Sequence, residues 1–333
     1  MVVEFLYEYG LFLAKTATFV VAIALIIGLL AGAASAKSRT KKGHLQFTDL
    51  TEHYQAITED MQQQLLNKKQ FKHWQKSQQK VKAELQPKLF VLDFKGSMDA
   101  KEAESLREEV TAILAVAKQE DEVLLRLESG GGVVHGYGLA ASQLDRLRQH
   151  SLNLTVAIDK VAASGGYMMA CIGNTILAAP FAIVGSIGVI AQLPNFNKLL
   201  KKHDVDFEQF TAGEYKRTVT VFGENTDKGR QKFQHELEET HVLFKQFVLQ
   251  HRPQLDIDKV ATGEHWFGHQ ALALNLVDTI QTSDDYIQKQ MTLRQVFQVK
   301  YQLRKGIAEK VGVGSASIIA HYWQKLIQHN WIR

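Results

Sequence analysis

The sequence predicts an α/β fold built around a largely parallel sheet. Short apolar runs alternate with amphipathic helical patterns between residues 89 and 179, and this alternation is typical of βαβ units. Two glycine-rich turns, Gly130–Gly132 and Gly165–Gly166, each come shortly after an apolar run. Because ligands bind at the carboxyl ends of parallel strands, we expect the functional site at these turns.

Each expected element has its own signal. The apolar runs predict strands over Leu89–Phe94, Val123–Leu127, Leu152–Ile158 and Thr175–Ala179. Apolar residues at helical spacing predict helices from Asp99 to about Lys118, through Leu139–Leu147, from Ser164 to about Cys171, over Lys228–Gln250 and over Gly268–Leu276. The run Ile176–Pro194 is uncharged, but Pro180 and several small residues interrupt it. We interpret that run as a buried strand and a loop rather than as a membrane-spanning helix.

The amino-terminal segment predicts a membrane anchor. Residues 16–36 contain no charged side chain, and a helix of this length spans a bilayer core of about 30 Å. A cleaved signal peptide is the alternative, since Ala34-Ser35-Ala36 resembles a cleavage site. We favour the anchor, because the apolar run is long and residues 1–15 carry two acids and one lysine.

Charge and composition divide the rest of the chain. The formal net charge is +4, which is too small to indicate nucleic-acid binding. Residues 37–88 hold eleven Lys/Arg and five Asp/Glu, a net charge of +6, so the rest of the chain sums to −2. We therefore expect a basic, polar helical stalk over 37–88, a catalytic domain over 89–290 and a tail over 291–333 with an amphipathic helix. The single cysteine, Cys171, excludes a disulfide framework within the chain.

Ser164 is the first candidate for chemistry. It follows an expected strand, opens an expected helix and precedes Gly165 and Gly166. A helix N-terminus favours developing negative charge, and the N–H of Gly165 can face an oxyanion. A plain helix-capping serine is the alternative interpretation. The G-x-S-x-G elbow of α/β-hydrolases is absent, because Ala162 occupies its first position.

The turn Gly130–Gly132 offers backbone N–H groups to an anion or an oxyanion. A phosphate-binding loop is not supported, because neither a G-K-[ST] ending nor the G-x-G-x-x-G spacing is present. The base that activates Ser164 would be Lys216 or, as an alternative, His135. A lysine pKa of about 10.4 has to fall to about 7 for this role, through burial and nearby positive charge such as Arg217.

Several motifs then follow one another in a specific order. Ala162-Ala163-Ser164-Gly165-Gly166-Tyr167 precedes Gly185-Ser186-Ile187-Gly188-Val189, and Gly213-Glu214-Tyr215-Lys216 comes after both. Upstream, Ser129-Gly130-Gly131-Gly132 looks like an S-P-G-G turn, and the stretches LDFKGSMDA, VHGYGLAASQL and ATGEHW extend the likeness. In this combination the chain resembles the signal peptide peptidase A family of Ser/Lys proteases, and in particular its membrane-anchored bacterial branch. The likeness covers about residues 89–290.

The resemblance implies a fold and catalytic roles. The fold would be a Clp protease/crotonase-like superhelix of ββα units, usually assembled into rings. Ser164 would be the nucleophile and Lys216 the general base, while Ser186 would orient the lysine amine. The resemblance implies neither a metal nor an organic cofactor.

The resemblance also implies an oxyanion hole. Its donors would be the N–H of Gly165 and an N–H from Gly131 or Gly132. The chain departs from the family at Gly130, where the family has proline. Proline fixes the backbone φ angle, so glycine there would leave the turn more mobile.

The expected function is peptide-bond hydrolysis by a membrane-anchored serine endopeptidase, acting on membrane-derived or misfolded peptides. We expect a homo-oligomeric ring of single-pass proteins of the bacterial inner membrane, each anchored by residues 16–36. We expect no nucleic-acid partner. Basic residues just after the anchor point to a cytoplasmic domain, whereas the resemblance favours the periplasmic side. Two alternatives are a catalytically idle peptide-binding scaffold and a crotonase-like acyl-CoA enzyme, although no CoA-pocket residues can be identified.

Overall fold

The computed structural model describes residues 7–23, 43–79 and 87–303. It divides into two compact units, Leu45–Tyr301 on the one hand and Met1–His44 with Gln302–Arg333 on the other. In the second unit residues 7–23 are helical. No helix among the described residues is both long and apolar enough to cross a bilayer. The expected anchor at 16–36 is described only as far as residue 23, and the expected amphipathic helix of the tail lies outside the described residues.

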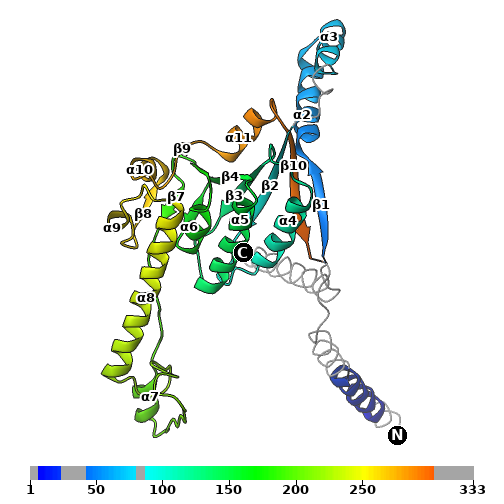
Figure 1. Ribbon diagram of the computed structural model, residues 1–333. Helices are drawn as coiled ribbons and strands as arrows, with labels where there is room; N and C mark the ends of the chain where they lie inside the picture. The colour runs from blue at the N-terminus through cyan, green and yellow to red at the C-terminus, as the bar shows by residue number, and fades with distance from the viewer. Residues whose placement is uncertain (1–6, 24–42, 80–86, 304–333) are drawn as a thin grey trace, which may run out of the picture. The chain divides into compact units, whose positions relative to one another are not determined.

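Two sheets organise the larger unit (Figure 1). Seven strands form the first, in the order β1-β10-β2-β3-β4-β6-β9, and three form the second, in the order β5-β7-β8. The strands are β1 His44–Asp49, β2 Lys88–Lys95, β3 Glu122–Glu128, β4 Asn153–Ile158, β5 Val161–Ala163, β6 Thr175–Ala178, β7 Ile183–Gly185, β8 His265–Phe267, β9 Thr279–Ile280 and β10 Gln295–Gln302. All pairings from β10 to β9 are parallel, whereas β8 runs antiparallel to β7. The expected α/β fold with a parallel sheet is confirmed, and the superhelix of ββα units stays a prediction.

Helices cover both faces of the larger sheet. They are α2 Leu50–Leu65, α3 Lys68–Gln79, α4 Ala103–Val116, α5 Val134–Gln149, α6 Gly165–Ala170, α7 Asn197–Lys202, α8 Asp227–His251, α9 Ile257–Val260, α10 Gly268–Ala273 and α11 Ser283–Gln290. Figure 1 shows α4, α5 and α6 side by side over one face. The main apolar core lies beneath these helices, and a smaller apolar cluster with residues of α11 lies on the other face.

The alternation of side chains along β2 shows why its sequence is almost continuously apolar. Phe90, Leu92 and Phe94 point into the main core, while Leu89 and Val91 belong to the smaller cluster on the opposite face. Successive side chains of a strand point to opposite faces, so a strand buried on both faces needs apolar residues at nearly every position.

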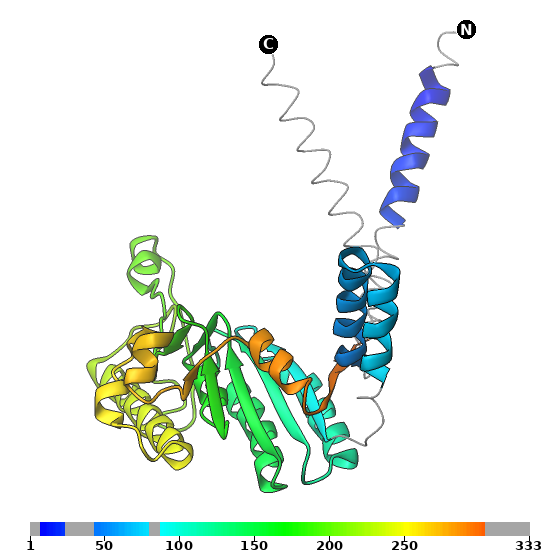
Figure 2. The ribbon, with the colours of Figure 1, turned by 90° about the horizontal axis from the view of Figure 1, so that it is seen from above.

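The structure differs from the expected boundaries at both ends of the larger unit. The segment expected as a helical stalk contains the strand β1 before α2 and α3, which form the projecting pair of helices in Figure 2. At the other end β10 begins at Gln295, beyond the expected limit at residue 290, and pairs with β2. Its sequence QVFQVKYQ is too polar to be recognised as a buried strand. In agreement with this, only Val296 and Val299 of the strand are buried. The run 176–194 forms short strands and a loop, as expected.

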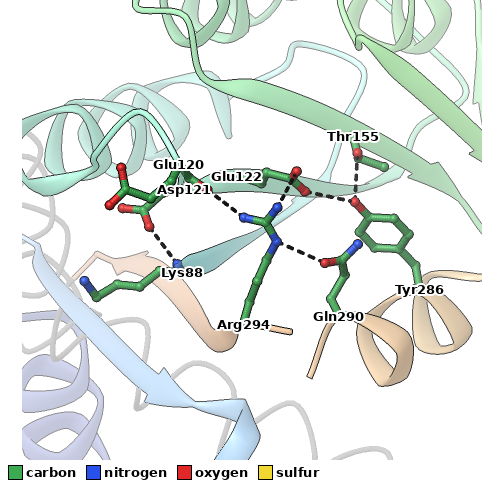
Figure 3. Close-up of polar contacts among 8 residues, drawn as sticks. All are labelled: Lys88, Glu120, Asp121, Glu122, Thr155, Tyr286, Gln290 and Arg294. Carbon is green, nitrogen blue, oxygen red and sulfur yellow. Dashed lines mark hydrogen bonds and ion pairs between the residues drawn. The ribbon is translucent and has the colours of Figure 1, made fainter. Parts of the chain in front are cut away.

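A polar network fixes the turn between α11 and β10 against the amino ends of β3 and β4 (Figure 3). Arg294 donates to Glu122 at 2.8 Å, to the carbonyl of Glu120 at 2.7 Å and to Gln290 at 3.1 Å. Tyr286 donates to Glu122 at 3.3 Å and lies 3.2 Å from the hydroxyl of Thr155. The network lies at the amino ends of the strands, so it stabilises the sheet opposite the glycine-rich turns.

Candidate active site

Ser164 has an unusual backbone conformation between β5 and α6. Its φ is +53° and its ψ is −119°, a combination that costs a non-glycine residue of order 1–3 kcal/mol. Its N–H donates to the carbonyl of Gly185 at 2.8 Å, and its own carbonyl accepts from Met168 at 3.0 Å. The side chain makes no capping hydrogen bond, so the helix-cap interpretation does not hold. The half-buried hydroxyl is left available for chemistry.

The turn Gly130–Gly132 lies directly against Ser164. Gly131 has a φ of +86°, and a Cβ on it would lie 2.7 Å from Ser164 Cβ and from Gly165 N. A Cβ on Gly132 would lie 2.0 Å from the carbonyl oxygen of Met98. Neither position has room for a side chain, so the absence of one lets the backbone approach the nucleophile closely.

The hydrogen bonds of this turn distinguish its two possible oxyanion donors. The N–H of Gly131 donates to the hydroxyl oxygen of Ser129 at 3.1 Å, so it is already used. Over the described residues, the N–H groups of Gly132 and Gly165 have no acceptor within the chain. Gly132 and Gly165 are therefore two backbone groups beside Ser164 whose N–H can donate to a developing negative charge.

Ser186 lies on the segment that follows β7 and faces the same cavity as Ser164. This cavity has a volume of about 710 Å³, and both serines line it together with Gly130–Gly132. Ser186 has a φ of +52°, and its N–H donates to the carbonyl of Glu264 at 2.6 Å. The structure thus brings together the expected nucleophile, the expected orienting serine and the glycine turn.

Lys216 is not brought to this cavity within one chain. Its side chain is exposed, and neighbouring residues pack on the amino-terminal part of α8: Glu214 pairs with Lys228 at 2.6 Å, and the Tyr215 ring lies 5.8 Å from Lys232 Nζ. The cavities at Ser164 contact α8 about twelve residues further on, from Thr240 to Phe247. At 1.5 Å per residue this separation is roughly 18 Å along the helix. A lysine side chain is too short to bridge it.

A second cavity beside Ser164 is mainly apolar. Its volume is about 420 Å³, and it is lined by residues of α5, α6 and α8. Gly138 and Ser142 face it from α5, Met168 from α6, and Leu243 and Phe247 from α8. A pocket with this lining suits an apolar side chain of a bound peptide.

Comparison with known proteins identifies the family to which this chain belongs. The N-terminal domain of peptidase family S49 matches residues 4–144, and the domain named Peptidase family S49 matches residues 146–297. This chain belongs to peptidase family S49. "Probable protease SohB" of Haemophilus influenzae is 53% identical over 330 residues, which are 94% of this chain and 93% of that protein. A protein of the same name from Buchnera aphidicola subsp. Schlechtendalia chinensis is 51% identical over 302 residues, which are 85% and 99% of the two chains.

Membership of family S49 confirms the resemblance seen in the motifs and the expectation of a protease. A solved structure of a membrane-bound stomatin-specific protease with a substrate peptide is also similar, at 11% identity and a TM-score of 0.44 over 68% of this chain and 97% of that one. A likeness as slight as this carries no argument about the site.

His135 and the single cysteine of this S49 peptidase are unsuited to the chemistry. His135, the alternative base, is exposed at the start of α5 and lines neither cavity at Ser164. Burial raises the pKa of the Cys171 thiol to about 12, so the thiol stays protonated and unreactive at neutral pH.

His241 is a site residue that the sequence did not reveal. It lies on α8 and lines the larger cavity together with Ser164 and Ser186. Its Nε2 atom lies 3.2 Å from the carbonyl oxygen of Ile187, which can only accept, so Nε2 carries the proton and donates. No motif marks this histidine, because only the packing of α8 against the Ser186 segment brings it to the cavity.

Proposed function

We propose that this S49 peptidase is a serine endopeptidase in which Ser164 is the nucleophile and Lys216, supplied by a second copy of the chain, is the general base. The proposal is carried by the arrangement at Ser164, where a strained, uncapped serine lies between two backbone N–H groups and an apolar pocket. Such an arrangement fits acyl transfer, because the N–H groups lie where the oxyanion would form.

The exposure of Lys216 is the reason for invoking a second copy. A lysine becomes a base near neutral pH only when burial or positive charge lowers its pKa, and Lys216 is exposed in the single chain. The segment around it has exposed apolar side chains, among them Phe210 at 90% and Tyr215 at 48%. Exposed apolar surface of this kind marks protein–protein contacts. Packing against another copy would bury Lys216 and bring its amine to the Ser164 cavity.

The mechanism follows from these positions. The neutral amine of Lys216 takes the proton of the Ser164 hydroxyl, and the alkoxide attacks the carbonyl carbon of the scissile bond. Gly132 and Gly165 donate to the resulting oxyanion. The lysine ammonium then gives its proton to the leaving amine, and water hydrolyses the acyl-enzyme by the same route. Ser186 orients the lysine amine.

The apolar pocket suggests the class of substrate. An apolar side chain next to the cleaved bond would fill the cavity formed by Met168, Leu243 and Phe247. Peptides rich in apolar residues, such as fragments of membrane proteins or of misfolded proteins, present such side chains. An extended peptide would bind along the glycine turn by adding a strand.

We further propose that residues 16–36 anchor the protein in a bacterial inner membrane, with the catalytic domain on the periplasmic side. The uncharged length of this segment supports the anchor. The resemblance seen in the motifs favours the periplasmic side, whereas the basic residues after the segment favour a cytoplasmic domain. Fusion of alkaline phosphatase or of a fluorescent protein to the carboxyl terminus tests the side. Phosphatase activity is expected, and fluorescence without phosphatase activity would contradict the proposal.

A fluorophosphonate probe tests the nucleophile, since it labels only an activated serine. We expect the full-length protein to be labelled, Ser164→Ala to remain unlabelled and Lys216→Ala to be labelled far more slowly. A second candidate function, peptide binding without catalysis, is favoured by the exposure of Lys216 in the single chain. Binding of peptide without any labelling would support that candidate and contradict the proposed peptidase.

A further inference from the structure

Tyr137 lies beneath the catalytic turn and contacts both of its sides. It belongs to the first turn of α5 and is fully buried. A Cβ on Gly165 would lie 2.4 Å from Tyr137 Cγ, so the tyrosine ring packs directly against the backbone of one oxyanion donor. At its other end the hydroxyl reaches Ser97 and Ser129.

The hydrogen bonds at the hydroxyl have only one possible direction. The carbonyl of Ser97 can only accept, so the Tyr137 hydroxyl donates to it, at 2.9 Å. The single hydroxyl proton is then used, and the short contact between Tyr137 and Ser129 requires the Ser129 hydroxyl to donate. Ser129 in turn accepts from the N–H of Gly131 at 3.1 Å. A directed chain therefore runs from Gly131 through Ser129 and Tyr137 to Ser97.

The surroundings keep this chain intact. Ser129 is buried, and a Cβ on Gly96 would lie 2.4 Å from the Tyr137 hydroxyl, so residue 96 leaves just enough space for it. Burial raises the pKa of Tyr137 above its ordinary value, which keeps the hydroxyl protonated. The carbonyl at the end of the chain is held as well, because it also accepts from the N–H of Ala100 at 3.1 Å.

We propose that Tyr137 is a positioning residue for the oxyanion hole, holding Gly165 with its ring and the turn Gly131–Gly132 with its hydroxyl through Ser129. This inference rests on the proposed function. The contacts of Tyr137 also restrain the backbone of this turn, which Gly130 does not, since glycine leaves φ free where proline would fix it. When the Gly131 N–H is held by Ser129, the peptide plane that follows is oriented so that the Gly132 N–H stays free beside Ser164.

Tyr137→Phe tests the inference because it keeps the ring and removes only the hydroxyl. The matched control is Tyr167→Phe: Tyr167 is equally buried, but its hydroxyl donates to the carbonyl of Leu276 at 2.9 Å, away from the cavities. Turnover is measured on a quenched fluorescent peptide with leucine before the cleaved bond. We expect kcat of Tyr137→Phe to fall by about tenfold with KM unchanged, below the 10²–10³ typical of losing a whole oxyanion donor. Tyr167→Phe should keep kcat while losing thermal stability.

Ser129→Ala breaks the same chain one step nearer the turn and keeps the test decisive if Tyr137→Phe folds poorly. We expect a similar fall in kcat, and the double variant should lose no more than the more impaired single variant, because both interrupt one chain. A peptide aldehyde, which forms an oxyanion on Ser164, should bind about tenfold more weakly to either variant. The matching peptide alcohol should bind equally to all variants.

Two results would overturn the inference. One is a kcat of Ser129→Ala equal to that of wild type. The other is equal weakening of aldehyde and alcohol, which would indicate a general structural role. Ser164→Ala separates this failure from that of the proposed function: an inactive Ser164→Ala beside a fully active Ser129→Ala removes only the role of Tyr137. Full turnover by Ser164→Ala would remove both.

Discussion

The Nε2–H of His241 donates to the carbonyl of Ile187, with 3.2 Å between the two heavy atoms. This contact joins the middle of α8 to the segment that carries Ser186. The other two hydrogen bonds that hold the segment, from Ser164 to Gly185 and from Ser186 to Glu264, are made by backbone groups alone. His241 is therefore a side chain through which the position of Ser186 can be changed by mutation.

His241→Ala should lower kcat/KM by about tenfold, since losing one hydrogen bond costs roughly 1 kcal/mol and the segment gains freedom. His241→Gln is the matched variant, because its amide N–H can donate to the same carbonyl and should restore most of the activity. Steady-state kinetics on the quenched peptide measure both. Equal activity of the alanine variant and wild type would show that the contact does not position Ser186.

Gly138 controls the depth of the apolar pocket. It lines the cavity beside Ser164, and a Cβ on it would meet no atom within 4 Å, so a larger side chain enters empty space. We expect Gly138→Leu to reduce cleavage after leucine or phenylalanine by about a hundredfold, because the pocket is filled, while cleavage after alanine persists. Gly138→Ala is the control and should keep the wild-type preference. Profiling with a peptide library measures the change, and an unaltered preference in Gly138→Leu would place the substrate side chain elsewhere.

Glu109 should make the protein less stable as the pH rises towards neutrality. Its pKa is raised from 4.5 to about 7, mainly by burial and to a lesser extent by Asp93, while the N–H of Tyr301 and Lys300 oppose the shift. Because the folded state binds this proton more tightly, stability falls as pH increases from about 4.5 to 7, by roughly 3 kcal/mol. The loss is complete above the folded pKa.

Glu109→Gln isolates this effect. Glutamine keeps an oxygen for the Tyr301 N–H and carries no charge, so the variant should unfold at higher urea concentration than wild type at pH 8 and at similar concentration near pH 5. Glu108→Gln, on the exposed side of the same helix, is the control and should change little. If the difference in stability between wild type and Glu109→Gln is the same at pH 8 as at pH 5, the expected titration is contradicted.

The sequence was informative wherever a segment is buried on both faces or requires glycine. The strand over Leu89–Phe94 and the turn Gly130–Gly132 were predicted because their patterns admit few alternatives. The strand β10 was missed, because its half-exposed sequence resembles a polar tail. The short strands β5, β7 and β8 are each three residues long, too short to have a recognisable period.

The candidate site was predictable to the same extent. Motifs placed Ser164, Ser186 and the glycine turn together, and the structure has them around one cavity. The contribution of His241 depends on how α8 packs, and no local pattern encodes that packing. The position of Lys216 at the site is not determined by one chain, since its segment contacts α7 and the amino-terminal part of α8 rather than the cavities at Ser164.

Mixing two inactive variants tests the central claim most directly. Ser164→Ala and Lys216→Ala are purified separately, shown to be inactive, and mixed in equal amounts under conditions that allow subunits to exchange. If Lys216 acts on the serine of a neighbouring copy, mixed assemblies contain intact sites, and about one quarter of wild-type activity should return. A mixture that exchanges subunits but stays inactive would show that no lysine crosses from one copy to the next, and would contradict the proposed site.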